Sequence, residues 1–556
     1  MTSESKIVKI SIDIGTENTV CVFYDNQNQE IKKLIFPGNL PFFKSIVDFS
    51  TLPVTIAVPN PNAISQTKRL LGKKFQDEKI QEMIKSGIFP YTIVEGENGL
   101  CKIVCKNKQK ENVQISIAEI YVCLVHYVKK SLISCIKNDF DIEAIVTIPC
   151  GFTDNEIRLT KRAVEAVGIK FIGQLKEPQA AIYAYHKKLT EDGFYLVFDL
   201  GAGTFDYTIV KISKNGKMKE CFHSDGDAFL GGLNLDEELA KLVLKKWKEN
   251  VDEPLVIERK FNIANEQGRK KFASLKGFVE KYKIDLCTKS WNIYNSSSYI
   301  NKTEEERYQL SMNEIIQIDL SMYDQMVDVV VQITSEEFEK CIRHHLMRCI
   351  NIIEEGFPKN KYDVRKSLIK EIILVGGSSQ IVGIKRMLKN TFPKAKIKDD
   401  IDPHMVVAIG ALQYQIDRER NIPDVAYKNV LLHDIFLESE YGPEMIIEKG
   451  VELPHSHEFV VRINNDGFST KLYEGYETVN GIKKPKHLKN YGHYFKAEKE
   501  EFVMLTLNVD YEGYLTMKAV HPNGMVFDLQ SNLEKEEQRE VPEKYYQDFI
   551  RKYLEK

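Results

Sequence analysis

The stretch Tyr195-Leu196-Val197-Phe198-Asp199-Leu200-Gly201-Ala202-Gly203-Thr204-Phe205-Asp206-Tyr207-Thr208-Ile209-Val210 decides the fold. It is typical of an apolar strand that ends in an aspartate, a turn of small residues, and a second apolar strand that returns. Successive N–H groups in such a turn form a cradle for an anion, and glycine permits close approach because it has no side chain. The stretch therefore predicts a phosphate site made by Asp199, Gly201, Ala202, Gly203 and Thr204.

A second copy of this pattern stands near the N-terminus. The strand Val8–Ile14 alternates with period two, the turn Gly15-Thr16-Glu17-Asn18 follows, and the strand Val20–Tyr24 returns. Asp13 supplies the carboxylate before the turn, as Asp199 does in the first copy. Two distant copies indicate a pair of related lobes rather than a solenoid of adjacent repeats.

A third motif has a strand, a glycine turn and a helix. The apolar run Glu371–Val375 is followed by Gly376-Gly377-Ser378-Ser379 and a helix from about Val382 to Asn390. A helix N-terminus attracts anions, so this turn is a further phosphate contact. Another strand, Ala144–Pro149, precedes a helix predicted to begin with Asp154 as its N-cap. Strands alternating with helices predict an α/β fold.

The texture changes after Asp424. The apolar tract Val430-Leu431-Leu432 with polar flanks indicates a linker, and short strands with turn signals then continue to about Gln530. We therefore predict an α/β domain over residues 1–424, a linker over 425–434, an all-β domain over 435–531 and a short helical tail over 532–556. The polar stretch from Trp291 to about Gln317 is interpreted as a surface insertion.

Composition limits the partners and the compartment. The formal net charge of 556 residues is -3, which favours neither nucleic acid nor an anionic membrane. The ten cysteines form no CxxC pair and indicate free thiols in a reducing compartment. Neighbouring His344 and His345 point to different faces of a helix, which disfavours a metal site there. Without an apolar signal core or a membrane-length apolar window, the expected location is the cytoplasm.

The chain resembles the seventy-kilodalton heat-shock chaperones, within the actin and sugar-kinase superfamily, from about Lys6 to about Leu529. The resemblance is carried by Ile12–Thr16, Lys68–Phe75, Glu177–Ala181, Phe198–Asp206, Leu230–Gly232 and Leu374–Ser378. It implies a two-lobed actin-like ATPase domain followed by a β-sandwich that binds polypeptide and a short C-terminal helix. Tyr473–Gly475 and Gly513–Leu515 resemble parts of the family's β-domain.

The resemblance also implies roles for individual residues. Lys68, Glu177, Asp199 and Thr204 would be catalytic, and Asp13 and Asp199 would hold Mg²⁺ through water. ATP or ADP would contact Gly15, Thr16, Glu17, Gly201, Ala202, Gly203, Thr204, Glu280, Lys283, Gly376, Gly377 and Ser378, with Asp206 supporting the second turn. Pro149, Leu431 and Leu432 would relay the nucleotide state. The implied partners are unfolded polypeptide segments, a J-domain co-chaperone and a nucleotide-exchange factor.

Several positions depart from the family pattern. Ile284 and Gln380 stand where two arginines usually stack on adenine, and their absence removes a cation–π contribution of about 0.5–2 kcal/mol per contact. Glu17 puts a carboxylate in the first phosphate turn, where it is repulsive unless it turns outward or pairs with a cation. The family's helical lid is nearly absent. An alternative is therefore a nucleotide-gated co-chaperone without turnover. A filament former or a sugar kinase is disfavoured by the β-rich region.

Overall fold

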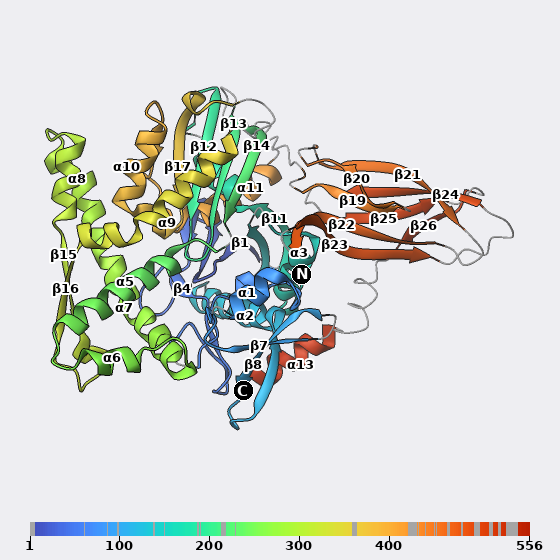
Figure 1. The fold of residues 1–556 in the computed structure, drawn as a ribbon. Coiled ribbons are helices and arrows are strands. Elements are labelled where there is room, and N and C mark those ends of the chain that lie inside the picture. Colours follow the sequence, from blue (N-terminus) through green and yellow to red (C-terminus); the bar gives the residue numbers. More distant parts are fainter. Residues whose placement is uncertain are drawn as a thin grey trace.

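The structure is a computed structural model. It describes residues 6–60, 62–85, 87–96, 99–136, 140–149, 151–185, 188–189, 191–212, 218–227, 229–357, 364–420, 431, 433–439, 441–449, 451, 453–463, 468–479, 482–493, 501–510, 515–520, 524–529 and 543–555. Two α/β lobes lie side by side, and a β-rich part extends from one of them (Figure 1). The predicted α/β class is confirmed by this arrangement of sheets and helices.

Lobe I is the part of the chain from β1 to α4. Its main sheet has the order β11-β10-β1-β2-β3, with β4 paired to β2. Strand β1 runs parallel to β10 and antiparallel to β2, which sets Asp13 beside Thr147. The main strands are β1 (Lys6–Ile14), β2 (Asn18–Asp25), β3 (Glu30–Lys33), β4 (Phe42–Lys44), β10 (Phe140–Ile148) and β11 (Lys170–Lys176). The shorter strands are β5 (Val47–Asp48), β6 (Thr55–Ile56), β7 (Thr92–Glu95), β8 (Cys101–Lys106) and β9 (Asn112–Ser116).

Lobe II is the part from β12 to β18. Its sheet has the order β14-β13-β12-β17-β18. Strand β12 pairs with β17 in parallel and places Asp199 opposite Val375, so the second and third glycine turns leave the same edge. The strands are β12 (Gly193–Leu200), β13 (Phe205–Ile212), β14 (Met218–Asp227), β17 (Ile369–Val375) and β18 (Lys396–Lys398), with a hairpin of β15 (Ile315–Asp319) and β16 (Val330–Thr334).

Helices α4 (Glu177–Tyr185) and α11 (Val406–Glu419) pack together between the two sheets and join the lobes. The other helical elements of lobe I are η1 (Thr67–Leu70), α1 (Glu78–Lys85), α2 (Ile117–Ile136) and α3 (Asp154–Ala166). Those of lobe II are α5 (Gly232–Glu249), α6 (Pro254–Lys260), α7 (Glu266–Asn295), η3 (Ser297–Tyr299), α8 (Glu304–Met312), η4 (Leu320–Met322), α9 (Ser335–Gly356), η6 (Lys366–Leu368), η7 (Gly377–Gln380) and α10 (Val382–Thr391). Among the described residues, no helix is both long and apolar enough to cross a membrane.

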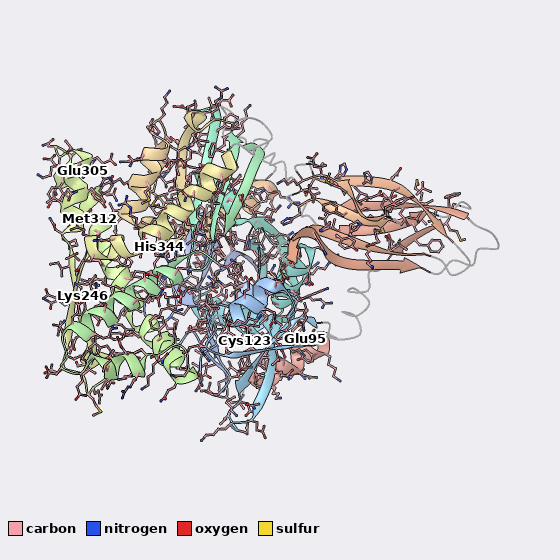
Figure 2. The ribbon with its side chains drawn as sticks, in the orientation of Figure 1. Glu95, Cys123, Lys246, Glu305, Met312 and His344 are labelled. Atoms are coloured by element: carbon pink, nitrogen blue, oxygen red, sulfur yellow. The ribbon has the colours of Figure 1, made fainter. Side chains whose placement is uncertain are left out.

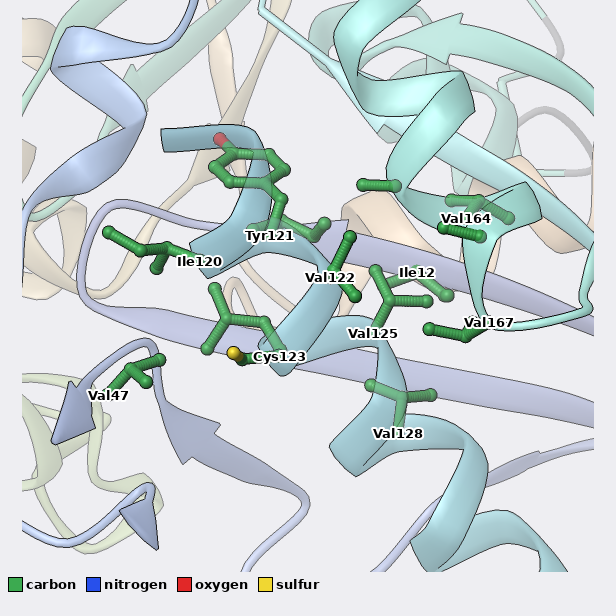
Figure 3. Close-up of a cluster of buried hydrophobic side chains, with 14 of the residues drawn as sticks. Ile12, Val47, Ile120, Tyr121, Val122, Cys123, Val125, Val128, Val164 and Val167 are labelled. Carbon is green, nitrogen blue, oxygen red and sulfur yellow. The ribbon is translucent and has the colours of Figure 1, made fainter. Parts of the chain in front are cut away.

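The core of lobe I is built around α2. Its side chains are apolar on most faces, and Ile120, Val122 and Val125 are fully buried against the sheet and α3 (Figure 3). A helix that is apolar nearly all round is stable only when covered on several sides, and here strands cover one side and helices the others. This packing holds the end of β1, and therefore Asp13, in place.

The β-rich part, here called the β-unit, consists of β19 to β26. It contains two four-stranded sheets, of order β20-β19-β22-β23 and β21-β24-β25-β26, and one apolar cluster draws on both. Its strands are β19 (Ile435–Ser439), β20 (Gly442–Ile447), β21 (His455–Ile463), β22 (Phe468–Val479), β23 (Ile482–His493), β24 (Glu501–Val509), β25 (Leu515–Val520) and β26 (Val526–Leu529).

The last helix, α13 (Glu543–Tyr553), lies on lobe I and not on the β-unit (Figure 1). Its apolar face enters the core of lobe I through Tyr546, Phe549 and Ile550, and Leu554 just after the helix joins them. The N–H of Val54 donates to the last helical carbonyl, of Tyr553, at 2.8 Å. The tail is thus part of the packing of lobe I.

The structure shows the N-cap of α3 and the stretch from Trp291 to Gln317 in more detail than the sequence did. The N-cap of α3 is Thr153, so the prediction of Asp154 was wrong by one residue; Glu156 accepts a hydrogen bond from the Thr153 N–H, and the Asp154 carboxylate accepts instead from Arg158 Nε at 2.7 Å. The stretch from Trp291 to Gln317 is largely regular structure. It forms the end of α7, then α8, and Tyr294 and Met312 pack against Val382.

Candidate nucleotide site between the lobes

The two phosphate turns face each other across the contact between the lobes. A Cβ added to Gly203 would lie 2.8 Å from Cγ2 of Thr16, so only a residue without a side chain allows the two turns to approach this closely. Arg69, on η1 of lobe I, donates from Nη2 to the carbonyl of Gly203 in lobe II at 2.6 Å. Each turn is closed by its own hydrogen bond, Gly15 N–H to Asn18 O and Gly201 N–H to Thr204 O.

Four carboxylates and one lysine gather beneath the turns. Lys68 donates to Glu177 at 2.7 Å, and both side chains are largely buried. Burial, followed by the charge of Glu177, raises the pKa of Asp206 to about 7. Burial also raises the pKa of Asp199, and Glu177, Asp206 and Asp13 raise it further. The carboxylates are therefore close enough to oppose one another's ionisation.

Asp13 completes this cluster from the end of β1. It accepts a hydrogen bond from the hydroxyl of Thr147 at 2.9 Å. Burial raises its pKa to about 6, while Lys68 acts in the opposite direction. With one lysine for four acids, the cluster is short of positive charge when all are ionised. The atoms of the four acids that could bind a cation are carboxylate oxygens, and Mg²⁺ accepts these as ligands, directly or through its waters.

The third glycine turn joins the same site. Gly376 has a φ of +78°, and a Cβ there would lie 2.4 Å from the carbonyl oxygen of Leu200 and 2.9 Å from Asp199 Oδ1. A side chain is excluded both by this φ and by the space. The hydroxyl of Ser378 lies 2.6 Å from where a Cβ of Gly232 would be, at the start of α5. Residues from β12, η7 and α5 therefore meet within van der Waals distance.

The negative charge of Glu17 in the first phosphate turn is compensated by the positive charge of Lys44. Lys44 Nζ lies 3.6 Å from Glu17 Oε1 and also makes a hydrogen-bonded ion pair with Glu280 on α7. Burial lowers the pKa of Lys44, but Glu17 and Glu280 outweigh this effect and hold it above its usual value. Lys44 comes from lobe I and Glu280 from lobe II, so this ion pair also bridges the lobes.

The residues expected near the ribose and base have other partners. Lys283 pairs with Asp236 at 2.7 Å and donates to the carbonyl of Gly232 at 3.1 Å, rather than pairing with Glu280. Ile284, one residue further along α7, is 52% exposed.

Sequence reasoning missed two residues at this site. A Cβ on Gly377 would lie 2.3 Å from Nε2 of His404, and the His404 ring stacks on Phe42 of β4 with centroids 5.9 Å apart. Lys44 was the other omission. Neither sits in a recognisable motif, because their positions depend on contacts between segments far apart in the chain.

A short path of contacts runs from the site to the β-unit. The hydroxyl of Thr147 donates a hydrogen bond to Asp13, and the chain continues from Thr147 through Pro149 to α3. At the start of α3, Asp154 accepts a hydrogen bond from the N–H of Leu515 in β25 at 3.2 Å. In return, Glu474 of β22 accepts from the Asp154 N–H at 3.3 Å, where a carboxylate is favourable at a helix N-terminus. Thr147 and Asp154, which connect the two ends of this path, are seven positions apart in the chain.

The other predicted relay residue that the structure describes, Leu431, lies apart from this path. Leu431 is 5% exposed and packs in the core of the β-unit, where its N–H donates to Val451 O at 2.9 Å. Leu432 and most of the predicted linker lie outside the described residues.

Paired strand–turn–strand hairpins, a third glycine turn and an acid cluster between two α/β lobes are together consistent with the actin-like class of fold. More narrowly, the chain belongs to the Hsp70 family, because the family model described as "Hsp70 protein" matches residues 10–521. The sequence-based resemblance is thereby confirmed.

Curated relatives are similar over much of the chain. A chaperone protein DnaK of Carsonella ruddii is 28% identical over 438 residues, which cover 77% of this chain and 65% of that protein. A chaperone protein DnaK of Buchnera aphidicola is 27% identical over 474 residues, covering 83% and 67% respectively. The chain thus spans about two thirds of the length of these relatives.

Proposed function

We propose that the chain is an ATP-dependent chaperone of the Hsp70 type that couples ATP binding and hydrolysis to the binding of unfolded polypeptide segments. ATP or ADP with Mg²⁺ would occupy the cleft between the lobes, and the β-unit would hold the polypeptide. J-domain co-chaperones and nucleotide-exchange factors are proposed as partners because the named relatives are DnaK chaperones.

The observation that carries the proposal is the acid cluster at the meeting point of three glycine turns. Phosphoryl transfer to water needs positioning and charge neutralisation rather than a covalent nucleophile. Mg²⁺, when bound, would neutralise phosphate charge, and Asp13, Asp199 and Asp206 supply the oxygens that would hold it through water. The backbone N–H groups of the turns would bind the phosphate oxygens.

Lys68 and Glu177 are suited to act on the attacking water. Their 2.7 Å ion pair fixes both side chains before any ligand arrives, which lowers the entropy cost of positioning. Glu177 would accept a hydrogen bond from the water, and Lys68, held protonated by Glu177 and Asp13, would stabilise the charge developing on the phosphate. The hydroxyl of Thr204, which hydrogen-bonds Asp206, lies in the same turn as the phosphate cradle.

The coupling would use the contacts between α3 and the β-unit. Movement of Asp13 on nucleotide binding would pass through Thr147 and Pro149 to Asp154, which bonds Leu515. Differential contacts of this kind typically produce couplings of about 1–3 kcal/mol between two sites.

The test measures ATP turnover and peptide affinity together. Wild type, Lys68→Ala and the control Lys161→Ala, which removes an exposed lysine from an ion pair with Glu165, would be assayed with Mg²⁺ and a panel of extended peptides. We expect slow turnover that peptide stimulates, loss of that turnover in Lys68→Ala alone, and weaker peptide binding with ATP than with ADP. Equal background rates in all three proteins would overturn hydrolysis. Tight ATP binding that shifts peptide affinity without turnover would instead identify a nucleotide-gated binding protein.

A further inference from the structure

A second cluster of ligand-type side chains lies in lobe II, outside the nucleotide cleft. Glu238 on α5 and the pair His344 and His345 on α9 bring one carboxylate oxygen and two imidazole nitrogens within 4.8 Å of one another. His344 lies on α9 in the view of Figure 2. We propose that these three residues form a binding site for a transition-metal ion of the zinc type, and that Cys341, one helical turn earlier on α9 and outside this group of atoms, turns in as a fourth ligand when the ion binds.

Helix geometry explains how two adjacent histidines can serve one ion. Neighbouring residues point about 100° apart around a helix, which on its own disfavours a shared ligand. His344 and His345 are three and four residues after Cys341. Their side chains therefore lie on either side of a line drawn parallel to the helix axis through the Cys341 side chain. An ion above that line is within reach of both rings, and the ring centroids are only 3.9 Å apart. The adjacency that argued against a site in the sequence is therefore compatible with one in the fold.

The opposing ligand is supplied by the neighbouring helix. Glu238 Oε1 lies 3.9 Å from His345 Nε2, and both side chains are less than one fifth exposed. Helices α5 and α9 are held by the same buried core, which includes Leu239, Val243 and Ile342. The backbones that carry the ligands are thus fixed. Ligands around a tetrahedral zinc ion are about 3.3 Å apart, so small side-chain rotations suffice to close the site.

The ligand chemistry selects the kind of ion. Two imidazoles, a carboxylate and a thiol are ligands typical of zinc and of similar transition metals, whereas Mg²⁺ and Ca²⁺ prefer oxygen ligands alone. One cation competes for the site: Lys241 Nζ lies 2.9 Å from Glu238 Oε1. The same ammonium is 2.8 Å from Glu237 Oε1, so Lys241 keeps an ion-pair partner when Glu238 turns to the metal.

A metal ion bound by these residues would link α5 to α9. The first residues of α5 hydrogen-bond the second phosphate turn, through Gly232 N–H to Gly201 O and Leu233 N–H to Ala202 O. A metal ion that joins α5 to α9 would therefore hold one wall of the nucleotide cleft. The proposal does not depend on hydrolysis, and it can be tested without nucleotide.

The experiment uses the full chain stripped of metal with a chelator. Zn²⁺ is titrated by calorimetry in excess Mg²⁺, which occupies sites made only of carboxylates, and Co²⁺ is titrated in parallel and followed by visible absorption. We expect one ion per chain with a dissociation constant on the order of 1 µM or below. The double variant His344→Ala/His345→Ala should weaken Zn²⁺ binding about 100-fold or more, equivalent to about 2.7 kcal/mol. Cys341→Ser should remove the thiolate-to-cobalt absorption band.

Two controls make the result decisive. His126→Ala removes a histidine from α2 of the other lobe and should leave zinc binding unchanged. Thermal unfolding without metal checks that the variants fold, which is expected because His344 is exposed and Cys341 and His345 are partly exposed. Zinc binding that the double histidine variant retains, or binding only at millimolar concentration, would overturn the site. An unchanged cobalt spectrum in Cys341→Ser would overturn the place of the thiol in it.

Discussion

Replacing Lys44 with methionine tests how this chain accommodates a carboxylate in a phosphate turn. Lys44 lies 3.6 Å from Glu17 and also pairs with Glu280 across the lobes, and its side chain is 25% exposed. Methionine keeps the apolar stem but removes the charge. Glu17 and Glu280 then lie largely buried, without that cation, beside the place where three phosphates are expected.

The size of the effect follows from the geometry. Two unit charges 3.6 Å apart interact by about 4.6 kcal/mol at an effective dielectric constant of about 20. Desolvation offsets much of this, so we expect a net loss of about 1.4–2.7 kcal/mol in nucleotide binding, or roughly 10–100-fold in the dissociation constant. Adding Glu17→Gln to Lys44→Met removes the carboxylate in the phosphate turn and leaves only Glu280 without that cation, so the double variant should bind within about 3-fold of wild type.

Calorimetric titration with Mg-ADP measures all four proteins of this double-mutant cycle. Lys188→Met is the matched control, because that lysine makes an exposed ion pair with Asp400 and should not affect binding. If Lys44→Met binds like wild type, the neutralisation argument is refuted. If the double variant binds no better than Lys44→Met, the lysine contacts the nucleotide itself and compensation of Glu17 is not its role.

Three further expectations concern the tail, the acid cluster and the link to the β-unit. Phe549→Ala on α13 should lower the unfolding free energy by about 3–5 kcal/mol in denaturant titrations, whereas the exposed Arg551→Ala should not; equal effects would show that α13 is not part of the core. Burial raises the pKa of Asp206 to about 7 and that of Asp13 to about 6, so both carboxyl groups must lose a proton before a cation binds to them. The affinity for Mg-ADP should therefore rise with pH between about 6 and about 7 and then level off. In the metal-free protein the same raised values mean that the folded state binds more protons, so stability should fall as pH rises from about 4 to about 7; a flat profile in both measurements would contradict the acid cluster. Asp154→Ala should reduce the effect of ATP on peptide affinity about 5–10-fold while ATP binding persists, and an unchanged effect would exclude this route of coupling.

Local pattern was enough for the elements that carry the turns. An apolar strand before Asp199, small residues after it and a returning strand allow one local conformation, because the alternation and the glycines act over a few residues. The first residue of a helix was harder to predict. Thr153, not Asp154, caps α3; both residue types are common N-caps, and only in the folded structure does the Asp154 carboxylate bond Leu515 of the β-unit.

The partners of charged residues could not be read from the sequence. Lys44 and Glu280 are 236 positions apart, and Asp236 and Lys283 are on different helices. Ion pairs of this kind depend on how lobes and helices pack, which spacing along the chain does not encode. The same reason explains why His404 was missed.

The sequence by itself determined the α/β class, the strand–turn–strand cradles around Asp13 and Asp199, and the membership of a family, because short-range patterns and motifs specify these. The tertiary structure alone decided that Lys44 neutralises Glu17, that Asp154 faces the β-unit and that α13 covers lobe I. These outcomes depend on burial and on charges brought together from distant segments, where desolvation makes each unpaired group costly. The phosphate turns could thus be predicted one by one, whereas the site they form exists only once the lobes have closed on each other.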